Sequence, residues 1–353
     1  MPSFTKFDGT LRSVASDTAR KASFDEIPII SLAVPKDQLI SEIRDISTRV
    51  GFFYIRDHGV PEDLINRVFD VSKQFFHQPK EQKAEVHFNK SNAFRGWEPM
   101  AETWVDDKQK PDRKEIFCWG HEESLGPEQK AVNPDGKLYT INNAMAAENM
   151  WPSSVPDFQP LVLEYYGEVL QLARRLIRIF AVALNLNEDY FDAMAAQPGT
   201  LGNIVYYPPQ PPTQSDIGIS PHTDLVALTI LCQSAQDGLQ VLNPNNEWIL
   251  APSIPGTFVV NIGDMLERWS NGLFVSTAHR VINITGKERF SIPVFFGPNF
   301  DTIVEPLPTC TSKERPANYK PVQAGQFLFD GLSESNNRKE KKEKGQTVKT
   351  IEV

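Results

Sequence analysis

SPHTDLVALTILCQ, residues Ser220 to Gln233, combines an apolar run with two polar side chains at its head. From Leu225 onward the run is rich in Leu, Val and Ile, which predicts a buried strand. His222 and Asp224 would be costly to bury there unless something satisfies them. Successive side chains of a strand alternate between its two faces, so we expect His222 and Asp224 to project the same way. The pair indicates half of a metal site, and the alternative is a satisfied histidine beside a capping aspartate.

A third candidate ligand lies downstream, in STAHRVIN, where His279 falls in another predicted strand. Two histidines and one carboxylate would form a facial triad, which leaves metal positions open and is typical of non-haem Fe(II) centres that react with O₂. A structural zinc site would instead close its shell with four protein ligands, usually including cysteine. The spacing of His222, Asp224 and His279 therefore favours a catalytic iron site.

RVINITGKERFSIPVFF continues from this strand and turns at Thr285 to Lys287. The return strand begins at Arg289, and Arg289 and Ser291 share one of its faces. We expect hairpin pairing to bring both residues back toward His279. A guanidinium fork and a hydroxyl suit a carboxylate group. The alternative for Arg289 is a surface or structural ion pair.

Short apolar runs separated by Pro, Gly and Asn fill the chain after Pro198, among them GNIVYYP, GTFVVNIG and RFSIPVFFG. This pattern of short apolar runs predicts an α+β fold whose core is a sandwich or jelly roll, with helices packed outside it. Residues 158–186 predict a long bracing helix. We expect residues 1–25 and the charged tail at 333–353 to be disordered and residues 26–332 to form one domain. Its parts would be a helical and loop-rich region at 26–197, the core at 198–300 and a C-terminal segment at 301–332.

The composition limits the partners of the protein. The 353 residues carry a formal net charge of −9, with a pI near 5.3. No basic surface for nucleic acid or anionic membranes is therefore expected. The sequence contains no run of apolar residues long enough to span a membrane. Three cysteines without metal or redox spacing predict free thiols in a reducing compartment. We expect a cytoplasmic protein that acts on a small molecule, with no protein partner evident.

Together these motifs resemble the Fe(II)/2-oxoglutarate-dependent dioxygenase superfamily, in the branch that contains isopenicillin N synthase and the plant flavonoid and hormone oxygenases. The likeness extends from Glu26 to Leu332 and is carried by IPIISL, GFFYIRDHGVP, RGWEP, YYPP, HTD, NIGDMLERWSNG, STAHRV and RFSIPVFFGPN. It implies a distorted double-stranded β-helix, or jelly roll, as the catalytic core of an oxygenase domain. The resemblance also implies that His222, Asp224 and His279 hold Fe(II). The cosubstrate 2-oxoglutarate would meet Arg289, Ser291 and Tyr207.

The function implied by the resemblance is oxidation of an unactivated C–H bond of a small molecule with O₂, in secondary metabolism. Hydroxylation, desaturation, cyclisation and ring rearrangement would branch from one common oxidising intermediate. The alternative is a 2-oxoglutarate-independent oxidase of the isopenicillin N synthase type, in which Arg289 and Ser291 hold the substrate's own carboxylate. A jelly roll that binds metal without catalysis is a third class. The sequence does not name the substrate.

Three further residues are candidates for substrate contact. Asn203 shares a strand face with Tyr207, and Phe295 shares one with Arg289 and Ser291, so both are expected to face the pocket. Arg95, in the loop-rich NAFRGWEP, could reach an acidic group of the substrate. The alternatives are a strand-bridging role for Asn203, ordinary core packing for Phe295 and a contact with helix ends for Arg95.

Overall fold

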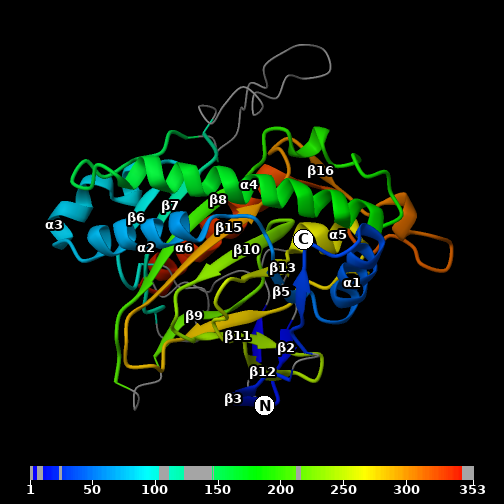
Figure 1. Cartoon of the computed structure of the whole chain (residues 1–353), viewed down its shortest axis with the longest axis horizontal. Helices are drawn as coiled ribbons and strands as arrows, with labels where there is room; N and C mark the ends of the chain where they lie inside the picture. Colours follow the sequence, from blue (N-terminus) through cyan, green and yellow to red (C-terminus); the bar gives the residue numbers. More distant parts are fainter. Residues whose placement is uncertain are drawn as a thin grey trace, which may run out of the picture.

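This computed structural model describes residues 3–5, 11–23, 26–102, 111–122, 145, 147–211 and 216–343, the last nine as backbone only. Its main features are two large sheets and a set of helices that lie over the larger one (Figure 1). The eight-stranded sheet has the order β4 (Ile29–Ser31), β5 (Phe52–Arg56), β13 (Phe258–Ile262), β10 (Leu228–Gln233), β15 (Arg289–Phe296), β8 (Leu201–Tyr207), β7 (Glu115–Gly120) and β6 (Gly96–Glu98). The five-stranded sheet has the order β3 (Ser16–Lys21), β12 (Glu247–Leu250), β11 (Leu239–Leu242), β14 (His279–Ile282) and β9 (Ile217–His222). Two sheets with several helices fit the predicted α+β class with a double-stranded β-helix core.

The centre of the larger sheet is buried on both faces. β10 pairs antiparallel with β13 on one side and with β15 on the other, and Leu228 lies opposite both Ile262 and Phe296. These side chains are buried, as are most of their neighbours on the three strands. A sheet covered on both faces needs such continuous runs of Val, Ile, Leu and Phe. The run LTILCQ in the sequence therefore forms a central strand.

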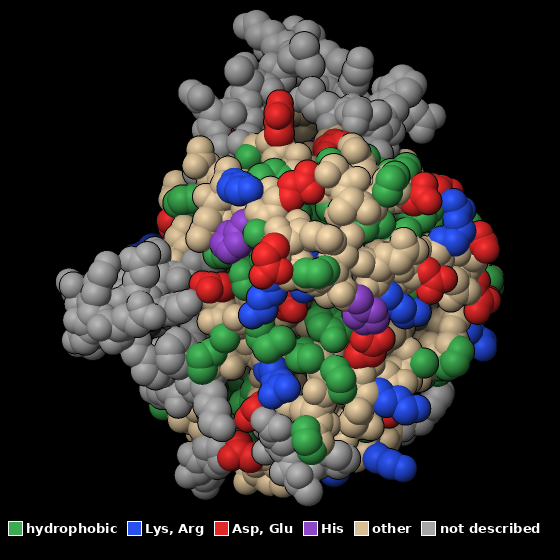
Figure 2. All heavy atoms as spheres, turned by 90° about the vertical axis from the view of Figure 1, so that its left-hand side faces the viewer, with side chains coloured by type: hydrophobic (Ala, Val, Ile, Leu, Met, Phe, Trp, Pro, Cys, Tyr) green, Lys and Arg blue, Asp and Glu red, His purple; other side chains and the backbone are tan. Residues whose placement is uncertain are grey.

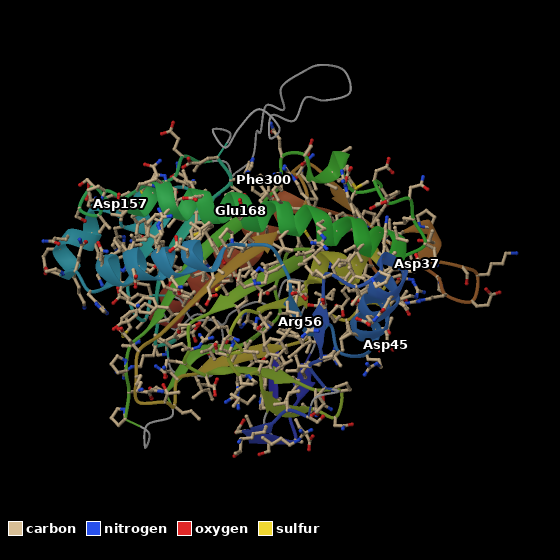
Figure 3. The ribbon with its side chains drawn as sticks, viewed as in Figure 1. Asp37, Asp45, Arg56, Asp157, Glu168 and Phe300 are labelled. Carbon is tan, nitrogen blue, oxygen red and sulfur yellow. The ribbon has the colours of Figure 1, made fainter. Side chains whose placement is uncertain are left out.

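Helix α4 (Phe158–Ala183) lies across the larger sheet, beside α1 (Lys36–Arg49) and α2 (Glu62–Phe76) (Figure 1). Tyr165, Val169 and Leu176 repeat at helical spacing and are buried, whereas Glu168 is exposed and points outward in Figure 3. The sequence predicts a long helix at 158–186, and the structure ends α4 three residues before that boundary. The remaining helices are α3 (Lys80–Lys83), α5 (Asp264–Trp269) and α6 (Ala324–Glu343).

Two details of the predicted strands are wrong. The run from Ser220 to Gln233 is not one strand, because β9 ends at His222 and β10 begins at Leu228 in the other sheet. β14 and β15 likewise form no hairpin, since β14 pairs with β9 and β11 while β15 pairs with β8 and β10. Both connections cross from the five-stranded to the eight-stranded sheet. Hydrophobic periodicity identifies the strands but carries no information on which sheet each one joins.

The N-terminal region, predicted to be disordered, contains strands in its described residues. β1 (Ser3–Thr5) pairs with β2 (Leu11–Ser13), and β3 adds a parallel strand to β12. Arg20 on β3 bonds Glu26 and Glu247 at 2.5 and 2.9 Å, so charged pairing holds a segment that has little apolar character.

The C-terminal prediction needs a similar correction. Helix α6 begins inside the predicted C-terminal segment and continues to Glu343, so the backbone is helical where a disordered tail was predicted from residue 333. Phe327 and Leu328 anchor its first turns in the core. β16 (Ile303–Val304) and β17 (Val322–Gln323) pair just before it. Residues 344–353 of the predicted tail lie outside the described residues.

Three features of the described residues relate to the composition: the surface charges, the helices and the cysteines. On the face drawn in Figure 2, the described Lys and Arg side chains are interspersed with Asp and Glu and with hydrophobic side chains. None of the helices in the described part of the chain has the length and apolar character of a membrane span. The three cysteines, Cys118, Cys232 and Cys310, are all free.

Candidate active site

Three potential metal ligands meet where the two sheets approach each other. His222 ends β9 and His279 begins β14, and the two residues are directly opposed in the antiparallel pairing of these strands. Their Nε2 atoms lie 3.7 and 3.6 Å from Oδ1 of Asp224. The potential ligand atoms of all three residues fall within 4.8 Å of one another. The structure brings the three predicted residues together, although a loop and not a continuous strand places Asp224.

The two oxygens of Asp224 have different surroundings. Oδ2 accepts hydrogen bonds from Thr229 Oγ1 at 2.5 Å and from Asn261 Nδ2 at 2.8 Å. Thr229 and Asn261 are cross-strand partners on β10 and β13, so the larger sheet supplies both donors. Oδ1 faces the two histidines. The carboxylate is therefore fixed through one oxygen and presents the other as a ligand.

Both histidines are held by backbone carbonyl groups two residues before them. Nδ1 of His222 lies 2.8 Å from the Ser220 carbonyl oxygen, and Nδ1 of His279 lies 3.3 Å from that of Thr277. A carbonyl oxygen can only accept, so each Nδ1 carries the proton. Each Nε2 is then left with a free lone pair directed toward Asp224. This is the tautomer that a metal ion requires.

Electrostatics keep the cluster in its metal-binding protonation state. Burial alone would raise the pKa of Asp224, but attraction by His279 and His222 and the hydrogen bonds of Asn261 and Thr229 lower it. Burial lowers the pKa of His279 to about 4, and repulsion by His222 acts in the same direction. A carboxylate and neutral imidazole are thus the favoured forms near neutral pH.

A second polar group forms around Arg289 at the start of β15. Arg289 is fully buried and lies opposite Tyr207 of β8, with its guanidinium carbon 4.9 Å from the centre of the tyrosine ring. Nε donates to the Gln236 carbonyl oxygen at 3.2 Å and Nη2 to Gln233 Oε1 at 2.8 Å. Nη1 is buried and has no hydrogen-bond partner among the described residues.

Hydroxyl groups complete this second cluster. Burial raises the pKa of Tyr207, although the charge of Arg289 and a hydrogen bond with Ser291 lower it in part. Ser291 lies two residues after Arg289 on the same face of β15 and is 2% exposed. The structure therefore brings together Arg289, Ser291 and Tyr207. A buried guanidinium with an unused N–H beside two hydroxyl groups fits the carboxylate of a small acid.

The three predicted substrate residues lie on different elements. Asn203 on β8 shares a face with Tyr207, and its side-chain oxygen is buried without a partner in the described part of the chain. Phe295 is half-buried on the face of β15 that carries Arg289. Arg95 is 2% exposed, and it donates to the carbonyl oxygens of Ala93 and Met145 at 2.9 and 3.0 Å. Among the described residues no acidic side chain pairs with Arg95.

Sequence reasoning missed the residues that orient the metal ligands. Thr229 is followed by three apolar residues in LTILCQ, and Asn261 is the single polar residue of FVVNI. A lone polar residue in a buried strand signals an unexplained partner, so both were detectable as anomalies. The Ser220 and Thr277 carbonyl groups carry no such signal, because every residue has one.

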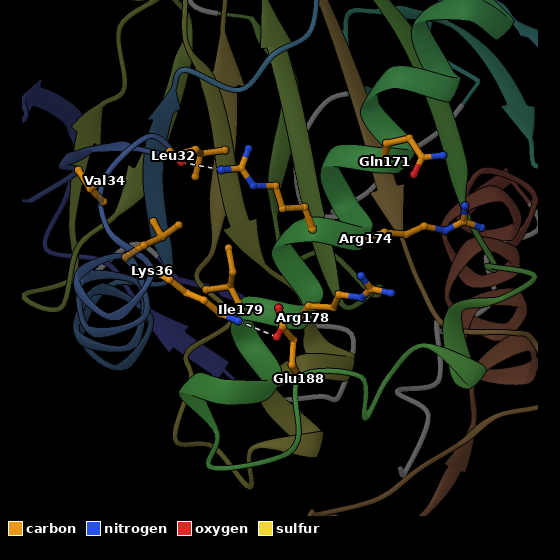
Figure 4. A pocket seen from close by; sticks show the side chains of 10 residues that line it. Leu32, Val34, Lys36, Gln171, Arg174, Arg178, Ile179 and Glu188 are labelled. Carbon is orange, nitrogen blue, oxygen red and sulfur yellow. Dashed lines mark hydrogen bonds and ion pairs between the residues drawn. The ribbon is translucent and has the colours of Figure 1, made fainter. Parts of the chain in front are cut away.

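A separate hollow lies outside this site, between the start of α1 and α4 (Figure 4). Its volume is about 470 Å³, and its lining includes Lys36, Arg175 and Glu188. Lys36 pairs with Glu188 at 2.6 Å, and Arg175 donates to the Leu32 carbonyl oxygen at 2.5 Å. These contacts tie α4 to the segments around it, and none of the metal-site residues lines the hollow.

Comparisons with known proteins agree with this geometry. The model of the 2OG-Fe(II) oxygenase superfamily matches residues 201–298, and that of the non-haem dioxygenase in morphine synthesis N-terminal region matches residues 27–154. The chain is 32% identical to the 2-oxoglutarate-Fe(II) type oxidoreductase hxnY of Emericella nidulans, over 90% of this chain and 91% of that protein. It is 38% identical to homoarginine-6-hydroxylase 2-ODD-C23 of Glycine max, over 77% of this chain and 81% of the relative.

Solved structures show the same relationship. A full-length Neurospora crassa protein, crystallised in complex with alpha-KG and thymine, superposes with a TM-score of 0.73 at 26% identity, over 88% of this chain and 98% of that one. JOX2 in complex with 2OG, Fe and JA gives 0.72 at 28% identity, over 90% and 87%. The resemblance in the sequence motifs is thus confirmed. This chain belongs to the 2OG-Fe(II) oxygenase superfamily and is a dioxygenase that uses Fe(II), 2-oxoglutarate and O₂.

Proposed function

We propose that His222, Asp224 and His279 hold the Fe(II) of this dioxygenase, and that the enzyme oxidises an unactivated C–H bond of a small molecule. The observation that carries the proposal is the orientation of the ligand atoms. Two unprotonated Nε2 atoms and one free carboxylate oxygen converge, while each opposite atom is hydrogen-bonded to the protein. Three protein ligands leave metal positions for 2-oxoglutarate and O₂.

Arg289, Ser291 and Tyr207 hold the distal carboxylate of 2-oxoglutarate in this proposal. The unpartnered Nη1 of Arg289 becomes a donor to that carboxylate, and the two hydroxyl groups donate beside it. Gln233 and the Gln236 carbonyl group fix the other guanidinium nitrogens, so the fork is oriented before the cosubstrate arrives. The fixed fork positions the keto-acid end of the cosubstrate toward the iron.

The cofactors supply the oxidation: 2-oxoglutarate is decarboxylated to succinate and CO₂ while O₂ provides the oxidising equivalents. The protein orients the target C–H bond and determines whether hydroxylation, desaturation, cyclisation or ring rearrangement follows. We place this reaction in secondary metabolism and in the cytoplasm, in a single distorted jelly-roll domain at residues 26–332. The oxidase alternative is not favoured, because hxnY is named as a 2-oxoglutarate-Fe(II) type oxidoreductase and both solved neighbours were crystallised with 2-oxoglutarate.

Asn203, Phe295 and Arg95 line the substrate side of the site in this proposal. Asn203 offers a free acceptor, Phe295 an apolar wall, and Arg95 a positive charge without an acidic partner among the described residues. Small molecules named for the relatives and solved neighbours are homoarginine, thymine and JA. They support a small-molecule substrate without fixing its identity.

Anaerobic addition of Fe(II) and 2-oxoglutarate tests the proposal without knowledge of the substrate. Wild-type protein should bind both and give a weak visible charge-transfer band, which Zn²⁺ with its filled d shell does not give. On admission of air, succinate should form slowly. Protein that binds Fe(II) but shows neither the band nor succinate would contradict the proposed 2-oxoglutarate site and support the oxidase.

A further inference from the structure

His222 lies at the end of an edge strand. β9 is the last strand of the five-stranded sheet and pairs with β14 alone within that sheet. This pairing has two register irregularities, between His279 and Val281 and between Val281 and Ile282. An edge strand with interrupted pairing has few backbone hydrogen bonds to hold its end in place. The orientation of His222 therefore needs support from the open side of β9.

Residues 112 and 113 supply that support from the segment that leads into β7. The Arg113 backbone N–H donates to the Ile217 carbonyl oxygen at 2.9 Å. Asp112 Oδ1 accepts from the Ser220 backbone N–H at 3.0 Å and from the Ser220 hydroxyl at 2.8 Å. Because β7 belongs to the larger sheet, this segment links the two sheets beside the metal site. Ser220 is the residue whose carbonyl oxygen holds Nδ1 of His222.

Lys114 neutralises the buried carboxylate. Its Nζ donates to Asp112 Oδ2 at 3.0 Å, and the two side chains are 4% and 0% exposed. Burial alone would lower the pKa of Lys114, but the charges of Asp112 and Glu98 raise it above its usual value. A buried charge pair of this kind is a costly way to gain stability alone, since apolar residues of similar volume often serve equally well.

We propose that Asp112, neutralised by Lys114, is a positioning residue that fixes Ser220 and thereby directs Nε2 of His222 toward the metal. The chain of contacts runs from Lys114 through Asp112 and Ser220 to His222, and every link is a hydrogen bond of 2.8 to 3.0 Å. The proposal rests on the proposed role of His222 as an iron ligand. Nothing in the resemblance or the comparisons assigns a role to Asp112 or Lys114.

The spacing of the two residues in the sequence is consistent with this role. In DRK, the two outer residues, Asp112 and Lys114, are buried. Arg113 is half-buried and pairs with Asp216 at 3.5 Å. Asp112 bonds both Ser220 and Lys114, so the ion pair and the support of β9 form one unit.

The test measures the affinity of the metal-stripped full-length protein for Fe(II) alone, under anaerobic conditions, by competition with a coloured chelator. Asp112→Ala should weaken Fe(II) binding by about 10- to 100-fold, the range found when partners of metal ligands are removed. Asp112→Asn retains an oxygen that can accept from Ser220, so it should recover most of the affinity. Its lost ion pair should appear instead as a lower midpoint of thermal unfolding.

The chain offers a matched control in the pair of Lys83 and Glu115. These side chains are also buried, at 3% and 9% exposure, and pair at 2.6 Å, but Glu115 bonds Trp97 and lies opposite Tyr206 of β8, not on the β9 side. Glu115→Ala should lower thermal stability and leave the Fe(II) affinity unchanged. An equal loss of affinity in Asp112→Ala and Glu115→Ala would overturn the proposal, because it would show a general effect of stability.

Ser220→Ala keeps every charge and removes only one hydrogen bond to Asp112, so it serves if Asp112→Ala does not fold. We expect its Fe(II) affinity to fall by about two- to tenfold, the range of a single hydrogen bond. Wild-type affinity in folded Asp112→Ala, or in Ser220→Ala when the aspartate variant is unfolded, would refute the positioning role. A wild-type protein without affinity for Fe(II) would refute the metal site as well as this proposal.

Discussion

His222 and His279 are directly opposed residues of two antiparallel strands, with their ring centroids 4.3 Å apart. The register of β9 on β14 therefore brings together two of the proposed ligands, which are distant in the sequence. A slip of one residue would turn one imidazole to the opposite face of the sheet. The metal site thus depends on the pairing of these strands as much as on the identity of its ligands.

Replacing any one of the three ligands should abolish turnover and stoichiometric iron binding. His222→Ala, Asp224→Ala and His279→Ala each remove one of only three protein ligands. Iron content after anaerobic loading and gel filtration is the measurement, with circular dichroism to establish folding. His58→Ala is a suitable control, because His58 stacks on Phe258 and lies outside the cluster. Wild-type turnover in any of the three ligand variants would exclude the assigned site.

Arg289→Ala should raise the KM for 2-oxoglutarate far more than that for the prime substrate. Loss of one partner of a buried charge pair costs ~2–5 kcal/mol, which corresponds to about 30-fold or more in affinity. The comparison is Arg280→Ala, which also removes a buried guanidinium. Arg280 stacks on Trp248 at 4.3 Å and bonds Gln240 in the five-stranded sheet. A similar rise in KM in both variants would contradict the assignment of Arg289.

Asn261→Ala should weaken iron binding although Asn261 is not itself a ligand. The substitution removes one of the two donors to Asp224 Oδ2 and frees the carboxylate to rotate. We expect the dissociation constant for Fe(II) to rise by about 10- to 100-fold. Asn299→Ala provides the control, since Asn299 is equally buried but bonds Gln197 and Ala193. Unchanged iron affinity in Asn261→Ala would show that Thr229 alone is sufficient.

The sequence identifies the three side chains that the structure brings together, because their chemistry depends on residue type. Two histidines and an aspartate at strand-like positions suit few roles besides metal binding, and Arg289 with Ser291 is similarly specific. The arrangement of strands is predicted less well. The turn at Thr285 to Lys287 has the composition of a hairpin, yet it carries the chain from one sheet to the other. Non-local pairing decides this, and a local pattern cannot show it.

Charge and composition also misled the prediction at both ends of the chain. β3 is polar, but Arg20 gains two acidic partners from elsewhere in the chain. The second half of helix α6 has the charged composition of a solvated tail. Phe327 and Leu328 in its first half are nevertheless buried in the core. In each case the stabilising contact is with a residue outside the local pattern. Asp112 is a further example, since its partner Ser220 lies on β9, 108 residues away in the sequence.

The pH dependence of stability should show the contribution of a buried histidine outside the metal site. Burial and the charge of Arg174 lower the pKa of His121 to about 4, and its Nδ1 lies 3.0 Å from the Tyr166 hydroxyl. The unfolded chain, in which histidine has its usual pKa near 6.5, therefore binds more protons between about pH 6.5 and pH 4. Stability from this residue is complete above that window and is lost as the pH falls through it.

His121→Gln should remove this dependence, because glutamine stays neutral throughout the window and still offers a polar atom to Tyr166. The measurement is the free energy of unfolding by urea at several pH values between 7 and 4, for metal-free wild type and variant. Other groups titrate in both proteins, so the difference between the two curves isolates His121. That difference should shift by up to about 3 kcal/mol in favour of the variant as the pH falls. Parallel curves would show that His121 has an ordinary pKa in the folded protein.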